Sequence, residues 1–245
     1  MREFNALAGY PAPAAPRVVG PEIRTIRHRL IAAARGKEFY DGDRRNGYGG
    51  FRYDGRWIPI ARTMMTEYDL TAASSVLQIN CEKGFLLHDL RQVVPGITVQ
   101  GTEISDYAIE TAMISVRPWI RKVPFTALPF PDRAFDVVIA IGAVYTLNLP
   151  DVVTCLKEIQ RVGKGRSFIT LASYETEEDR RLFEWWSLLG TTVLRPAEWV
   201  EVLQHAGYTG DYTFMNARVL KLTPQDQSQR EEEPCRWPKP QAVAR

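Results

Sequence analysis

A short apolar segment, a tight turn and an apolar helical run constrain this chain more than any other feature. Residues 76–79 predict a buried strand, residues 80–84 a turn, and residues 85–94 a helix. A second predicted strand, residues 98–101, ends just before Glu103. This order is a βαβ unit, in which an acidic side chain at the tip of the second strand can bind the two hydroxyls of a ribose. The unit therefore predicts a nucleotide-like ligand.

The turn departs from the glycine pattern that such units normally carry. Asn80 and Glu82 stand where the first two glycines of a Gly-x-Gly-x-Gly loop would fall, and Gly84 alone remains. Asparagine is the non-glycine residue best suited to a left-handed backbone. Glu82 is harder to explain, because its side chain stands where a ligand would approach the backbone.

The remaining segments alternate between strand and helix patterns, which predicts an α/β fold with a mostly parallel sheet covered by helices on both faces. Predicted strands are 76–79, 98–101, a candidate before 128–130, 135–140, 167–172, and a closing antiparallel hairpin of 212–215 and 218–222. Predicted helices are 21–35, 59–68, 85–94, 150–161, 177–189 and 196–205.

Three regions follow from this pattern: an N-terminal extension, 1–58, an α/β domain, 59–223, and a tail, 224–245, predicted to be disordered. Residues 1–20 are rich in alanine and proline and predict no fixed structure of their own. Residues 39–57 combine glycines with aromatic side chains and little aliphatic content; the aromatics include Tyr40, Tyr48, Phe51, Tyr53 and Trp57. This segment predicts either a lid over a ligand or a packed Ω-type loop.

Composition excludes several classes of protein. The 245 residues are 45% hydrophobic and 24% charged with a net charge of +2, as in an ordinary soluble domain, and this balance does not favour nucleic acid. No apolar run approaches a membrane span, and the N-terminus lacks a signal-peptide core, so we expect a cytoplasmic protein with no membrane partner. Cys81, Cys155 and Cys235 form no metal-type pair, and no metal site is expected.

Taken together, these residues resemble the class I S-adenosylmethionine (SAM)-dependent methyltransferases. Residues 76–85 replace the family's glycine-rich motif, and Glu103 precedes a helix that opens at Tyr107. The run Leu128-Pro129-Phe130-Pro131-Asp132, leading into residues 135–138, is among the family's more recognisable signatures. The resemblance implies a Rossmann-like fold with SAM as cofactor. The cofactor-binding residues that it implies are Gln78, Asn80, Cys81, Glu82, Gly84, Glu103, Ile104, Thr126 and Gly142.

Departures from the family pattern are local. Gln78 replaces the acid that opens the motif, and Pro124-Phe125 replaces an Asp-Ala pair that often contacts the adenine, so that contact falls to the backbone or Thr126. The methionine carboxylate could sit at the helix start after Gly84. We hypothesise that Glu82 pairs with the methionine amino group; the alternative is a surface glutamate near the turn.

The acceptor site of this fold lies at the carboxyl ends of the strands. The loop 142–148 is expected there, with Tyr145 and Asn148 as the first candidates for substrate or sulfonium contacts and Tyr174 as the next. The alternatives are a half-buried aromatic at Tyr145 and a helix cap at Asn148. Trp185 and Trp186 are expected to pack the predicted helix 177–189 against the sheet, although Trp186 could wall the acceptor pocket.

Basic side chains gather on the predicted helix 21–35. Arg24, Arg27, His28 and Arg35 share a face that is either solvated or in contact with an anionic substrate or partner. The histidines, His28, His88 and His205, are expected to be structural.

The leading hypothesis is a SAM-dependent methyltransferase acting on a small-molecule acceptor, and residues 40–57 are similar to small-molecule methyltransferases. One alternative is a SAM-binding enzyme of other chemistry, such as intramolecular cyclisation or aminocarboxypropyl transfer, which would release methylthioadenosine. Another is a non-catalytic protein that retains the fold. The oligomeric state stays open, with a homodimer among the options.

Overall fold

A seven-stranded sheet forms the centre of the computed structural model, which describes residues 1–12 and 15–226. The strand order is β1-β8-β7-β6-β3-β4-β5, and every neighbouring pair runs parallel. The strands are β1 Arg2–Glu3, β3 Ser75–Ile79, β4 Thr98–Glu103, β5 Ile120–Lys122, β6 Phe135–Ala140, β7 Gly163–Ala172 and β8 Asp211–Met215. The order reverses between β3 and β6, and the carboxyl ends of these two strands are therefore where such a sheet binds ligands.

Helices cover both faces of this sheet. They are α1 Ile26–Ala33, α2 Lys37–Tyr40, α3 Ile58–Glu67, α4 Phe85–Val93, α5 Asp106–Glu110, α6 Leu149–Val162, α7 Glu177–Trp186 and α8 Pro196–His205, with 3-10 turns at Arg117–Trp119 and Val144–Thr146. Within the described residues, no helix is long and apolar enough to span a membrane.

The core has two layers because strand side chains alternate between faces. Leu77 and Val138 pack with α6 and α8 on one face, whereas Val76 and Val137 pack with α3 and α4 on the other. All four side chains are fully buried. The expected fold, an α/β sheet with helices on both faces, is confirmed.

Local signals fix several helix ends. Asn148 precedes α6, and its side-chain oxygen accepts a hydrogen bond from the Asp151 amide at 3.0 Å. Pro196 opens α8 at its first turn, and Gly207, with φ of 69°, follows its end. The strand 135–140 and the helix 196–205 have the predicted bounds.

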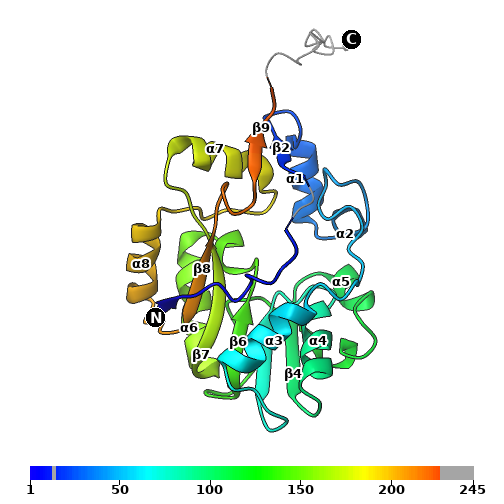
Figure 1. The fold of residues 1–245 in the computed structure, drawn as a ribbon, viewed down its shortest axis with the longest axis vertical. Coiled ribbons are helices and arrows are strands. Elements are labelled where there is room, and N and C mark those ends of the chain that lie inside the picture. Colours follow the sequence, from blue (N-terminus) through cyan, green and yellow to red (C-terminus); the bar gives the residue numbers. More distant parts are fainter. Residues whose placement is uncertain (13–14, 227–245) are drawn as a thin grey trace, which may run out of the picture.

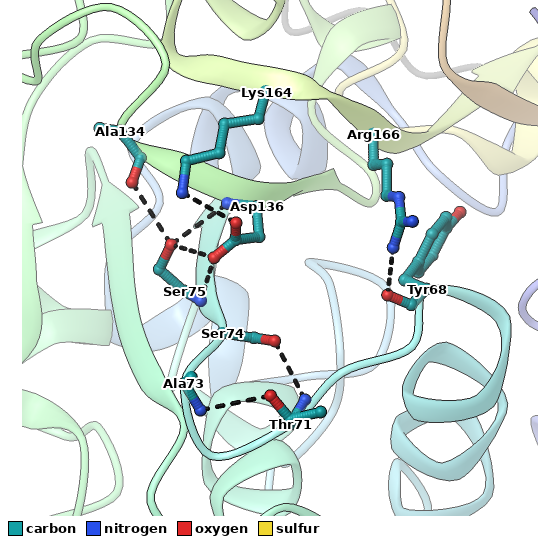
Figure 2. Close-up of polar contacts among 9 residues, drawn as sticks. All are labelled: Tyr68, Thr71, Ala73, Ser74, Ser75, Ala134, Asp136, Lys164 and Arg166. Carbon is teal, nitrogen blue, oxygen red and sulfur yellow. Dashed lines mark hydrogen bonds and ion pairs between the residues drawn. The ribbon is translucent and has the colours of Figure 1, made fainter.

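Polar contacts hold the amino ends of the central strands together (Figure 2). The Asp136 carboxylate accepts hydrogen bonds from the Ser75 amide and hydroxyl, both at 2.8 Å, and from the Lys164 ammonium at 2.8 Å. The hydrogen bond from Lys164 lowers the pKa of Asp136 to about 2. Asp136 thus joins β3, β6 and β7 at the amino ends of these strands. Their carboxyl ends, on the opposite side, are where a ligand is expected.

The predicted antiparallel hairpin is wrong. β8 pairs in parallel with β7, and the second predicted arm is mostly a turn that leads into β9 Leu222–Pro224. β9 pairs in parallel with β2 Arg17–Val19 in a separate two-stranded sheet. Leu220 and Leu222 are buried in one cluster with Leu182 and Phe183, which places this part of the chain against α7. Figure 1 shows β2, β9, α1 and α7 together at the top of the view, away from α3 and α4.

Residues 1–20, predicted to lack structure, contribute to both sheets. Arg2–Glu3 pairs with β8, Ala6 is fully buried in the α3–α4 layer, and Arg17–Val19 forms β2. A two-residue strand has no periodicity from which to predict it. Of the tail predicted to be disordered, Pro224 is the last residue of β9 and residues 227–245 lie outside the described residues.

Candidate functional site

The loop between β3 and α4 keeps the backbone of a glycine motif without its glycines. Asn80, Glu82 and Gly84 have φ values of 55°, 53° and 73°. An L-residue in this left-handed region costs about 1–2 kcal/mol, so contacts elsewhere must hold Asn80 and Glu82 in place. At Gly84 a Cβ atom would also lie 2.6 Å from Cγ2 of Val116.

Glu103 supplies one of those contacts from the end of β4. Its carboxylate accepts hydrogen bonds from the amides of Glu82 at 2.8 Å, Ile104 at 2.8 Å and Ser105 at 3.0 Å. The side chain is fully buried. Glu103 therefore holds the loop through hydrogen bonds to backbone amides, and its side chain does not face solvent.

Asn80 supplies another contact through its side chain. Its oxygen accepts a hydrogen bond at 2.9 Å from Arg35, and its nitrogen lies 3.5 Å from the carbonyl oxygen of Gly142. This amide bridges the loop, the N-terminal extension and the end of β6, which a glycine at this position could not do.

A cavity of about 540 Å³ opens at the carboxyl ends of β3 and β6. Four of the predicted site residues line it: Asn80, Glu82, Gly142 and Tyr145. Trp186 packs against the core cluster of α7, as expected for it, and also lines the cavity. These residues come from two separate loops, after β3 and after β6, and from α7.

The other implied cofactor residues lie around the cavity and not on its wall. Gln78, in β3, and Cys81 and Gly84, in the loop, are buried, Thr126 is half-buried, and Ile104 is 38% exposed. Within the described residues, the Gln78 side-chain oxygen is buried without a hydrogen-bond partner.

Two of the three candidates for acceptor contacts lie elsewhere. Asn148 is exposed and caps α6, as in the alternative considered for it. Tyr174 is buried, with the guanidinium carbons of Arg180 and Arg195 each 5.5 Å from its ring centroid. Tyr145 alone of the three lines the cavity.

The N-terminal extension covers the loop with residues 35–51, here called the covering segment. Asp41 is its main anchor, because its carboxylate accepts hydrogen bonds from the Lys83 ammonium at 2.7 Å, the Tyr107 hydroxyl at 2.7 Å and the Phe51 amide at 2.9 Å. The Tyr48 hydroxyl donates to the Glu82 carboxylate. Tyr48 and Phe51, two aromatics of the segment predicted as either a lid or a packed loop, line the cavity.

Tyr40 fills the space inside the covering segment. Its side chain is fully buried, and burial together with the nearby Glu103 and Glu82 carboxylates raises its pKa. Among the described residues its hydroxyl is buried without a hydrogen-bond partner.

Burial also shifts the pKa of Glu82, the acidic side chain of the loop. Desolvation raises the pKa of Glu82 to about 8, helped by the Glu103 carboxylate, while the Tyr48 hydrogen bond and Arg35 act in the opposite direction. Burial raises the pKa of Tyr145 to about 12, with Glu82 contributing. Tyr145 therefore stays protonated at neutral pH and can donate a hydrogen bond.

Arginine dominates the charge of the cavity wall. The six lining arginines are Arg17, Arg24, Arg35, Arg44, Arg52 and Arg56. Arg24 and Arg35 belong to the basic face predicted on residues 21–35, whereas Arg27 of that face is exposed. Arg17 and Arg44 were not expected, because Arg17 follows a proline-rich stretch and Arg44 lies in a loop without periodicity.

Comparisons with known proteins agree with this architecture. Residues 77–171 match the sequence family described as "Methyltransferase domain", a range that runs from β3 into β7. No curated protein matches the chain in sequence.

Solved structures share its fold at low sequence identity. A chain in the complex between the Haloferax volcanii Trm112 methyltransferase activator and a candidate methyltransferase has a TM-score of 0.50 and 21% identity, covering 74% of this chain and 75% of that one. The YcgJ protein of Bacillus subtilis has a TM-score of 0.51 and 18% sequence identity, covering 60% of this chain and 66% of that one. The [4+2]-cyclase SpnF has a TM-score of 0.52 and 16% sequence identity, covering 78% of this chain and 74% of that one. At such identities these structures show the fold alone.

Proposed function

We propose that this chain, whose residues 77–171 match the methyltransferase domain family, is a SAM-dependent methyltransferase that acts on a small molecule. The observation that carries the proposal is the loop of Asn80, Glu82 and Gly84, whose left-handed backbone lies at the switch point of the sheet and faces a cavity. SAM would supply a methyl group on a sulfonium, a good leaving group, so that positioning contributes much of the rate.

The methionine end of SAM fits the residues that line the cavity. Its amino group needs an anion and its carboxylate a cation, and Glu82 and Arg35 both line the wall beside the loop. Glu82 would hold the amino group, because an ammonium bound beside this carboxylate lowers its pKa and favours the ionised form. Arg35, already fixed to Asn80, would hold the carboxylate.

The ribose of SAM would reach Glu103 only after the covering segment moves away from the loop. Glu103 is the acid that would hold the ribose, yet it is fully buried and three backbone amides already donate to it. A carboxylate offers about four acceptor positions, so about one remains. Tyr40 lies beside it with an unpartnered hydroxyl, and a shift of residues 35–51 would give the ribose access.

In the proposed site the chain itself would orient the acceptor and exclude water. Tyr145, protonated at neutral pH, would donate a hydrogen bond to the acceptor and would not act as a base. Tyr48 and Phe51 would shield the reacting atoms from solvent when the covering segment is closed.

Calorimetric titration with SAM and with S-adenosylhomocysteine tests this proposal. We expect micromolar binding to the full-length protein, lost in Glu103→Ala and retained in Glu110→Ala, a matched change outside the site. Thermal unfolding of each variant separates loss of binding from loss of structure. Formation of S-adenosylhomocysteine with an acceptor would then support methyl transfer, whereas methylthioadenosine would indicate the alternative sulfonium chemistry.

A non-catalytic protein that retains the fold is the second candidate. The buried Glu103 and the replacement of two motif glycines favour it. It predicts no binding of either ligand even at millimolar concentration, which would contradict both enzymatic proposals.

A further inference from the structure

Three arginines gather where the N-terminal extension meets the end of α7. This arginine cluster consists of Arg17 from β2, Arg24 before α1 and Arg44 from the covering segment, and all three line the cavity. The guanidinium carbons of Arg17 and Arg24 lie 5.6 Å and 5.9 Å from the ring centroid of Trp186. The cluster therefore forms one wall of the cavity that also contains the loop of Asn80 and Glu82.

No acidic side chain of the described residues pairs with this cluster. Arg24 donates to the carbonyl oxygens of Trp186 and, at 3.4 Å, of Arg44 itself. Arg44 donates to the carbonyl oxygen of Gly47. The Arg17 guanidinium makes no hydrogen bond or ion pair within the described part of the chain.

The two acids on the cavity wall have other partners. Asp54 forms an ion pair with Arg56, and Glu82 accepts from Tyr48. Burial, with repulsion from Arg44, lowers the pKa of Arg17, and burial with repulsion from Arg44, Arg29 and Arg17 lowers that of Arg24 to about 10. The cluster is thus an uncompensated positive charge in a partly desolvated place.

A purely structural role explains only part of this arrangement. Arg24 and Arg29 donate to carbonyl oxygens in the last turn of α7, a favourable place for cations. This contact accounts for the position of α1. It leaves Arg17 without a function, since its guanidinium stacks near Trp186 and donates to no carbonyl.

We propose that the arginine cluster binds the carboxylate or phosphate of an organic anion, and that this anion is the methyl acceptor. The inference rests on the proposed function. Arginine is the side chain best suited to bidentate binding of such oxyanions. Aromatic rings extend from the cluster to the loop of Gly142. The ring centroid of Phe183 lies 5.7 Å from that of Trp186 and 6.2 Å from that of Tyr145. An acceptor with a flat apolar body would lie along Trp186 and Tyr145, with its anion at the cluster and its reacting atom toward Gly142.

Calorimetry on the full-length protein with benzoate, phenyl phosphate and the uncharged benzamide tests this inference. We expect at least one anion to bind about tenfold more tightly than benzamide, and Arg17→Gln to weaken anion binding about tenfold. Arg17→Lys should restore part of the affinity, because an ammonium keeps the charge without the bidentate geometry. Arg27→Gln, exposed and outside the cavity, makes the same charge change and should leave binding unaltered.

Each result points one way. A preference for benzoate identifies a carboxylate acceptor, and a preference for phenyl phosphate a phosphorylated one. Equal binding of benzamide, no anion binding, or equal effects of Arg17→Gln and Arg27→Gln would overturn the inference. Titration of the same variants with SAM separates the two proposals. SAM binding without anion binding contradicts only the inference. Anion binding without SAM binding contradicts the proposed function and, with it, the role of the anion as methyl acceptor.

Discussion

Glycine and its replacements in the β3–α4 loop show how single residues hold the site. Glu82 occupies a left-handed backbone position because its amide is bound to Glu103 and its carboxylate to Tyr48. Asn80 is held by Arg35 and Gly142. In this loop, side-chain contacts hold the left-handed backbone at Asn80 and Glu82, where glycines would adopt it freely. At Gly84, the third such position, there is no space for a Cβ atom.

Gly84→Ala should destabilise the protein by about 2–4 kcal/mol, since it adds left-handed strain and a clash with Val116. The matched change Gly207→Ala has a similar φ of 69° but open space around the new methyl group, so we expect a loss of only about 1 kcal/mol. Urea unfolding measures both free energies. Equal losses would show that the contact with Val116 is easily relieved.

Glu82 should make stability depend on pH. Its pKa of about 8 exceeds the value near 4.3 expected in the unfolded chain, so the folded protein binds the proton more tightly. This contribution to the free energy of unfolding is complete below about pH 4.3 and is lost as the pH rises through about 8. We expect wild type to lose stability relative to Glu82→Gln over this range. Parallel curves for the two proteins would show that Glu82 titrates normally.

At the scale of elements, the covering segment depends on one carboxylate. Burial alone would raise the pKa of Asp41, but the hydrogen bonds from Lys83 and Tyr107 hold it below its usual value. The Lys83 ammonium is buried, and Asp41 is its acidic partner. Releasing Asp41 should therefore release the segment from the loop.

Asp41→Asn should cost about 3 kcal/mol, because it leaves the buried Lys83 without a counter-charge. Hydrogen exchange should accelerate in residues 39–51 more than in the central strands. Asp43→Asn is the control: this exposed side chain pairs only with nearby Arg45 among the described residues, and we expect a change within about 0.5 kcal/mol. The double variant Asp41→Asn/Lys83→Met should recover stability, and failure to do so would argue against the ion pair as the anchor.

Elements with strong periodicity could be predicted, and elements fixed by distant contacts could not. The central strands and α8 follow from apolar runs bounded by proline and glycine. The partner of β9 is β2, some two hundred residues away, and no local pattern specifies that pairing. The same limit applies to the site. Asn80, Glu82 and Tyr145 follow strands, were predicted as site residues and line the cavity, whereas Arg17 reaches it through the pairing of β2 with β9.

At the scale of the whole molecule, the N-terminal extension and the α/β domain share their cores. Ala6 packs in one layer with Ile60 and Val76, and Phe39 and Tyr40 pack with Ala108 of α5. Arg2 pairs with Glu67 and Asp211, which lie on α3 and β8. Residues 1–58 are therefore expected to unfold together with residues 59–223 and not as a separate unit.

Ala6→Asp tests this cooperativity, because it places a carboxylate in a fully buried apolar position. We expect a loss of about 3 kcal/mol, and a midpoint lowered by roughly 6–12 °C, in a single transition seen alike by tryptophan fluorescence and far-ultraviolet circular dichroism. Ala15→Asp, the same change at an exposed position, should leave the midpoint within about 2 °C. Two transitions, of which Ala6→Asp moves only one, would show that the extension folds independently. In that case the cavity would lie between two units, and the affinity for a ligand would depend on how they dock.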